Sequence, residues 1–195
     1  MRIPQTIFAL VLCAATASAV HAQTATSEFT RATGPTKAPS GMSFSYDAQH
    51  GQITATGVQM NTVAKKPSAV TPTSGLIDLT INIKIVSRFE SGTTYHCSVY
   101  AIGGLINTDT GTVDGGIENA NGFATVTAPG MATCRIKIPY EWTLAGQGDT
   151  GLILAYGVGA INVHSEVEHS TLQVNGIDNL PANGTTSKFV FNVAL

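Results

Sequence analysis

The sequence has few charged residues and no apolar run long enough to span a membrane. Only 11% of its 195 residues are charged, less than half of the roughly 25% found in ordinary soluble domains. Ten basic residues oppose twelve acidic ones, and the only two adjacent basic residues are Lys65 and Lys66. Nucleic acid and anionic membranes are therefore not expected as partners, because binding to either requires a basic surface.

The longest apolar stretch lies near the N-terminus, from Ile7 to Val20. It follows Arg2 and ends in two small-residue cleavage motifs, Ala17-Ser18-Ala19 and Val20-His21-Ala22. This pattern is typical of a secretory signal peptide of bacterial style, whereas a spanning helix needs about 20 apolar residues. We expect residues 1–22 to be removed and the mature chain to be secreted to the periplasm, the cell surface or the medium.

Cysteine is also scarce. Cys13 lies inside the predicted signal peptide, so the mature chain keeps only Cys97 and Cys134. An even number of cysteines in an oxidising compartment favours one disulfide. Neither cysteine has the close spacing of a redox pair or the set of histidine partners of a metal site, and we predict a Cys97–Cys134 disulfide.

Alternating apolar and polar residues dominate the rest of the chain. Within the stretch from Leu76 to Phe89, isoleucine or leucine occupies every second position from Ile77 to Ile85, and the same period recurs from Ala132 to Trp142. Period two with β-branched residues predicts strands with one buried face. These patterns place Cys97 and Cys134 on the inner faces of their strands. Pro139, on the outer face, predicts a bulge or a sheet edge, because proline cannot donate to a ladder.

Further segments complete the expected organisation. Residues 23–41 have no periodicity, which is typical of a flexible leader. We predict a short hairpin over residues 42–60 and a long polar loop over residues 107–122. Leu152 to Val163 is apolar on both faces, as in a covered central strand, with Gly157 and Gly159 marking a bulge or a close approach. Because helical spacing is absent, we predict one all-β domain over residues 42–195, an immunoglobulin-like or jelly-roll β-sandwich of about eight to nine strands with one disulfide.

Two acidic segments are candidates for metal binding. In a strand, His164, Glu166 and Glu168 would share one face and form a possible three-ligand set, although a solvated polar face also explains them. Asp109, Asp114 and Glu118 lie in the predicted loop, which resembles a calcium loop only loosely because Thr112 replaces the glycine of the tight turn. Ordinary turn chemistry explains these residues as well. Whether a metal binds stays open, and no cofactor is expected.

Signatures of catalysis and of nucleotide binding are missing or misplaced. The chain has no serine nucleophile elbow, no helical His-Glu-x-x-His and no Cys-His pair. Residues 146–151 match a dinucleotide fingerprint in letters, but that motif must open a helix, and here a strand follows. A carbohydrate site would need exposed aromatic residues, and Tyr100 is the best outward-facing one. The sequence therefore favours a protein that is not an enzyme.

The C-terminal segment is the best candidate for an interaction site. Large apolar residues alternate at its end, and in an edge strand they could pair with another chain: Phe189, Phe191, Val193 and Leu195. We predict a secreted structural or adhesion-type surface protein that contacts itself or another surface protein. The alternatives are a monomeric extracellular module that binds carbohydrate or a metal ion, and an enzyme whose site is assembled from distant residues.

Overall fold

Strands, most of them paired antiparallel, make up most of the described chain. The computed structural model describes residues 26–27, 41–60, 71–107, 110–144, 150–175 and 179–195, so the predicted signal peptide and nearly all of the predicted leader lie outside the described residues. The described residues are all-β, with no helix. Their twelve strands, more than the eight or nine expected, are β1 (Thr26–Ser27), β2 (Ser43–Asp47), β3 (Gln52–Thr56), β4 (Gln59–Met60), β5 (Thr71–Lys84), β6 (Thr94–Asn107), β7 (Thr112–Phe123), β8 (Thr125–Ala128), β9 (Met131–Leu144), β10 (Thr150–Ile161), β11 (Val167–Val174) and β12 (Thr185–Ala194).

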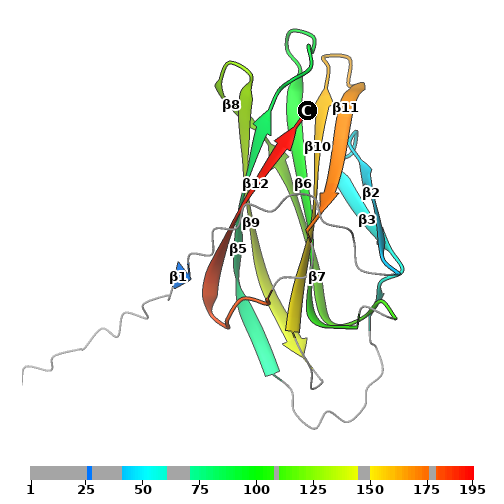
Figure 1. The fold of residues 1–195 in the computed structure, drawn as a ribbon, viewed down its shortest axis with the longest axis vertical. Coiled ribbons are helices and arrows are strands. Elements are labelled where there is room, and N and C mark those ends of the chain that lie inside the picture. Colours follow the sequence, from blue (N-terminus) through cyan, green and yellow to red (C-terminus); the bar gives the residue numbers. More distant parts are fainter. Residues whose placement is uncertain (1–25, 28–40, 61–70, 108–109, 145–149, 176–178) are drawn as a thin grey trace, which may run out of the picture.

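The first sheet is organised around β5. Its strand order is β1-β12-β5-β9-β8 (Figure 1), with β9 antiparallel and β12 parallel to β5. The alternation seen in the sequence decides which face is buried. Four side chains of β5 have no exposed surface, as the period of two predicts: Ile77, Leu79, Ile81 and Ile83.

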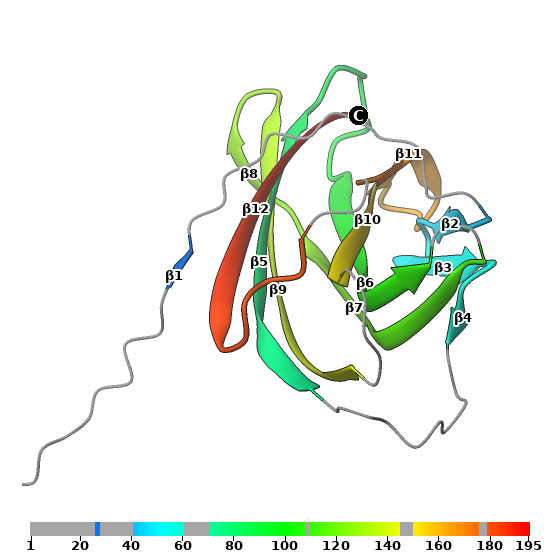
Figure 2. The same ribbon diagram turned by 60° about the horizontal axis from the view of Figure 1, so that its bottom comes forward.

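The second sheet has the order β11-β10-β6-β7-β4 and packs its inner face against the first. Figure 2 shows the two sheets as separate layers. Apolar side chains from both sheets form one buried cluster that includes the two cysteines. The predicted disulfide is confirmed: Cys97 on β6 and Cys134 on β9 are joined, with their Cα atoms 6.4 Å apart. This bond connects the two sheets through the core.

A hairpin of β2 and β3 forms a third layer on the outer face of the second sheet. The ring of Tyr46 packs on the backbone of Gly157, and Ala48 packs on Gly159. The two glycines thus mark the close approach that the sequence predicted. A second buried cluster lies beneath the hairpin, made of Met42, Ile102, Val113 and Ile153. Because the hairpin covers its outer face, β10 is buried on both sides.

The long polar loop predicted for residues 107–122 is wrong over most of its length. Residues Thr112–Phe123 form β7, which pairs with β6 at every position from Asn107↔Thr112 to His96↔Phe123. Glycine usually weakens a strand, but a β-carbon at Gly116 would overlap the ring of Trp142. Gly116, one of the glycines that suggested a loop, instead makes room for a large core side chain.

The position of Pro139 agrees with the sheet-edge alternative. On one side, β9 pairs with β5 along its whole length. On its other side β8 reaches only Thr133, so among the described strands β9 has a single neighbour at Pro139. The register with β5 has no bulge there.

Candidate functional site

The first candidate metal set does not share a strand face. Strand β11 begins at Val167, so His164 and Glu166 belong to the turn that precedes it. Asn162 organises this turn: its Oδ1 accepts hydrogen bonds from the backbone N–H groups of His164 and Glu166, at 3.0 and 2.9 Å. The strand that would have given the three side chains a common face does not include His164 and Glu166, because the Asn162 side chain stabilises a turn there instead.

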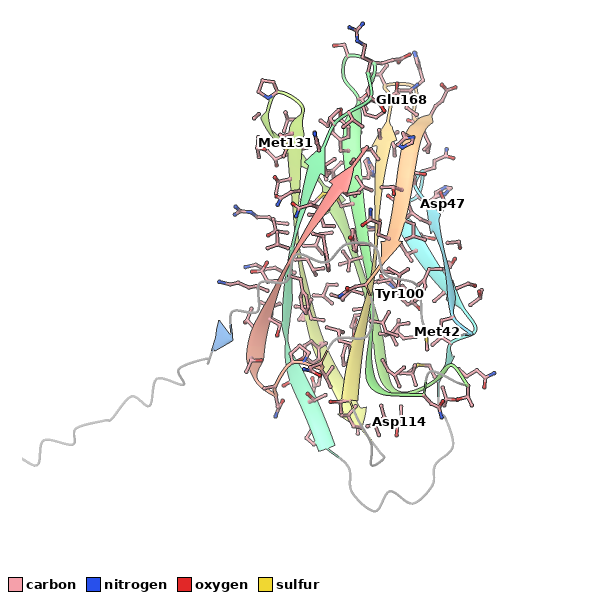
Figure 3. All side chains as sticks on the ribbon, viewed as in Figure 1. Met42, Asp47, Tyr100, Asp114, Met131 and Glu168 are labelled. Atoms are coloured by element: carbon pink, nitrogen blue, oxygen red, sulfur yellow. A yellow bond between two sulfur atoms is a disulfide. The ribbon has the colours of Figure 1, made fainter. Side chains whose placement is uncertain are left out.

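Glu168 has a different role from its two neighbours. Its carboxylate accepts a hydrogen bond of 2.6 Å from the Thr93 hydroxyl and one of 3.2 Å from the backbone N–H of Glu90. The carboxylate thereby ties β11 to the loop between β5 and β6, at the upper end of the molecule in Figure 3.

The second candidate set is spread along β7. Asp114 and Glu118 are four residues apart in an extended strand, which separates their Cα atoms by about 13 Å. Asp109 lies outside the described residues. In the parts of the chain that the structure describes, no three His, Cys, Asp or Glu residues come together in a group that could hold a metal ion.

The four C-terminal side chains predicted to contact a partner lie in the core. Phe189, Phe191, Val193 and Leu195 are all buried, and Phe191 stacks on Tyr156 with ring centroids 4.2 Å apart. The chain end is fixed as well, since the Leu195 N–H donates to the Lys84 carbonyl at 2.9 Å. What the terminal strand offers a partner is its backbone edge.

That edge is only partly covered within the described residues. On its inner side, β12 pairs with β5 from Thr185↔Gly75 to Ala194↔Lys84. On its outer side, β1 pairs with Thr186 and Ser187 alone. From residue 189 to residue 194 no other described strand lies beside β12. The outward side chains along this part are Val190, Asn192 and Ala194.

A second candidate site, which the sequence reasoning missed, lies between the β2–β3 hairpin and the outer face of β6 and β7. It consists of two adjoining hollows of about 270 and 190 Å³, which share Gly51 and Asn121. The larger hollow is lined by Gly51, Gln52, Ile53, Ser98, Val99, Asn119, Ala120 and Asn121. The smaller one is lined by Gln49, His50, Gly51, His96, Asn121, Gly122 and Phe123. We call the two together the hairpin groove.

Two sets of hydrogen bonds hold the hairpin turn at this groove. The buried Ser98 hydroxyl on β6 donates to the Gly51 carbonyl at 2.7 Å. At the start of the turn, the Asp47 carboxylate accepts from the backbone N–H groups of Gln49 and His50, and its Oδ2 lies 2.6 Å from His50 Nδ1. The hydrogen bond with His50 lowers the pKa of Asp47. The turn is therefore fixed over β6 and β7.

An exposed aromatic ring stands at one end of the groove. Phe123 is 69% exposed, and its ring meets the His96 ring edge-on with centroids 4.2 Å apart. Burial lowers the pKa of His96, which favours its neutral form. Tyr100, expected to be the best outward aromatic residue, is instead half-buried. Its ring packs edge-on against that of Phe44, with the ring centroids 6.2 Å apart. The alternation of Asn119, Asn121 and Phe123 was the sequence signal for this surface, and it was hidden when the segment was interpreted as a loop.

Comparison with protein-family models, with curated proteins and with solved structures gave no match. Among the described residues there is no helix of the length and apolar character that a membrane crossing requires.

Proposed function

We propose that the protein is a secreted, non-catalytic structural or adhesion-type surface protein with an immunoglobulin-like or jelly-roll sandwich fold. It acts through protein–protein contacts with a second copy of itself or with another surface protein. The observation that carries the proposal is the outer edge of β12, where residues 189–194 have no neighbouring strand within the described residues.

An open edge is chemically suited to this role. Its backbone N–H and C=O groups can accept a strand from another chain, and main-chain hydrogen bonds then supply the affinity. The other edge of the same sheet is less suitable, since β8 has only four residues and an irregular register between Val126 and Ala128. Short, irregular edge strands are a common protection against pairing.

The low charge of the chain also supports this proposal. Natural edge strands are often protected by lysine residues that repel or obstruct an incoming strand. The outward positions Val190, Asn192 and Ala194 carry no charge, so the edge beyond Lys188 has no such protection.

The test must leave the core intact. Deleting the last eight residues would remove four buried side chains, so loss of assembly would only report unfolding. We would replace Val190 and Ala194 together by lysine, because these side chains point outward from β12 and are half-exposed and exposed. The protein is expressed as the full chain, recovered from the secreted fraction, and its mass in solution is measured by size exclusion with light scattering.

We expect the unaltered protein to form a defined oligomer or filament and the double lysine variant to be a folded monomer. A matched control is Val126→Lys, which adds a positive charge to an exposed position on the opposite edge and should leave the mass unchanged. A monomeric unaltered protein that also fails to bind a surface protein of the producing cell would contradict the proposal, as would an oligomer that survives in the double variant.

A further inference from the structure

The hairpin groove has the chemistry of a binding site, and it lies on a different face of the molecule from the β12 edge. Its walls come from the hairpin turn on one side and from β6 and β7 on the other. A concave surface with a few placed polar groups is the usual form of a small-ligand site. The Ser98–Gly51 hydrogen bond, with Ser98 only 2% exposed, fixes the two walls relative to each other.

The lining of the groove selects against charged ligands. No residue around the larger hollow carries a charge, and the titratable side chains around the smaller one are His50 and His96. Recognition of phosphate, sulfate or carboxylate uses arginine or lysine, and neither lines the groove. A cation would need carboxylates, and the nearest one at the turn, Asp47, already accepts hydrogen bonds from the turn.

The polar groups that remain are mostly side-chain amides. Gln52, Asn119 and Asn121 are exposed and border the larger hollow. Each amide presents a C=O acceptor beside an NH₂ donor. Neighbouring hydroxyl groups on a sugar ring need the same alternation, because every hydroxyl both donates and accepts.

Phe123 supplies the apolar part of such a site. A sugar ring has an apolar face of C–H groups, which packs on an aromatic ring by dispersion and weak C–H contacts. The edge-on contact with His96 holds the Phe123 ring in place at the end of the groove. Asn119 and Phe123 are four residues apart on β7, so the lined surface extends about 13 Å along the strand. This length suits a chain of sugars better than a single ring.

We propose that the hairpin groove binds a neutral carbohydrate chain, with Asn121 at the junction of the two hollows as the central hydrogen-bonding residue and Phe123 as the stacking residue. A neutral peptide is the less favoured ligand, because extended peptides are held by main-chain pairing at a strand edge, whereas this groove lies over the face of the sheet. The site goes beyond the proposed assembly role and does not depend on it.

The test is calorimetric titration of the full secreted protein with neutral hexasaccharides from cellulose, starch, mannan, xylan, galactan and chitin. Hexagalacturonate serves as the anionic probe and an uncharged Gly-Ser-Thr decapeptide as the peptide probe. We expect binding of at least one neutral hexasaccharide and of neither other probe. Asn121→Ala and Phe123→Ala should each weaken that binding by about tenfold or more.

Matched controls separate the site from general effects on folding. Asn82→Ala and Val126→Ala change an asparagine and an exposed apolar residue of the first sheet, and neither should alter the affinity. Near-ultraviolet circular dichroism checks that the groove variants remain folded, which we expect because both altered side chains are exposed. The Val190→Lys/Ala194→Lys variant should bind carbohydrate normally, so failure of the assembly proposal and failure of this one give different results.

Three results would overturn the proposal. The first is that no neutral hexasaccharide binds. The second is binding of only the anionic or the peptide probe. The third is an affinity for the neutral hexasaccharide that stays unchanged in folded Asn121→Ala and Phe123→Ala.

Discussion

The indole ring of Trp142 lies directly on the backbone of Gly116. Trp142 comes from β9 in the first sheet and Gly116 from β7 in the second, so the contact crosses the core. On β6, Gly103 packs against the same ring. Two adjacent strands thus carry glycine where the largest side chain of the protein is buried, which lets the sheets pack closely around its ring.

Gly116→Ala should destabilise the protein. The added β-carbon would overlap the indole ring, and forcing extra volume into a packed core typically costs about 1–3 kcal/mol. Gly122→Ala is the matched control, because it lies on the same strand and its β-carbon would have Ile136 4.0 Å away as its nearest neighbour. Urea unfolding should show a lower midpoint for Gly116→Ala alone. Equal midpoints for the two variants would contradict this packing.

Removing the disulfide should cost more stability than any of the single substitutions. Cys97 and Cys134 are 37 residues apart, and in the chain-entropy model a loop of that length contributes about 4 kcal/mol. The double variant Cys97→Ala/Cys134→Ala should therefore unfold at a markedly lower denaturant concentration than the oxidised protein. Reduction of the unaltered protein should produce a similar shift; insensitivity to reductant would show that the bond contributes little.

Tyr156 should make the fold sensitive to alkali. Its hydroxyl donates to Gln173 Oε1 at 2.5 Å, and burial raises its pKa from 10.0 to about 12. Because the pKa is higher in the folded state, the stabilising contribution is complete below pH 10 and is lost as the pH rises towards 12. We expect the free energy of unfolding to fall by about 1–2 kcal/mol in this interval from this residue.

Tyr156→Phe tests this origin of the alkaline effect. The variant keeps the ring stacked on Phe191 but has no proton to lose. Urea unfolding below pH 10 and again between pH 10 and 12 should show a smaller loss of stability in Tyr156→Phe than in the unaltered protein. The same loss in both would assign the effect to the other tyrosines whose pKa values burial also raises: Tyr46, Tyr95, Tyr100 and Tyr140.

Ser98→Ala should loosen the hairpin from the second sheet. The substitution removes the donor to the Gly51 carbonyl at a buried position, and losing such a hydrogen bond costs about 1–3 kcal/mol. Ser170→Ala, at an exposed position on β11, is the control. Hydrogen exchange should become faster across β2 and β3 in Ser98→Ala only; unchanged exchange there would mean that the apolar contacts alone hold the hairpin.

Period-two alternation predicted the parts of the fold in which one face is buried. It identified the buried residues of β5 and β9 and placed both cysteines on the inner faces, because each pattern reflects contacts made along a whole strand. It failed for β7, where Gly115 and Gly116 look like turn residues, although Gly115 packs against the backbone of β6 and Gly116 against Trp142. Such contacts join residues that are distant in sequence, so the local pattern of residues along one strand does not predict them.

The candidate sites were harder to predict than the strands. Alternation correctly gave Phe189 and Phe191 a common face, but an apolar face suits a partner and a core equally well. The structure assigns these side chains to the core. The hairpin groove depends on where residues 49–53 come to lie over β6 and β7, and no spacing within either segment specifies that position.

The parallel pairing of β12 with β5 has a consequence for how the chain folds. Asn82 and Asn192, hydrogen-bonded neighbours in this pair, are 110 residues apart in sequence, and such non-local pairing is slow to form. The first sheet cannot close, nor the core be sealed, until the last residue of the chain has arrived. Until then β5 has an open side of its own, so the folding chain passes through a period in which another molecule's strand can take the place of β12.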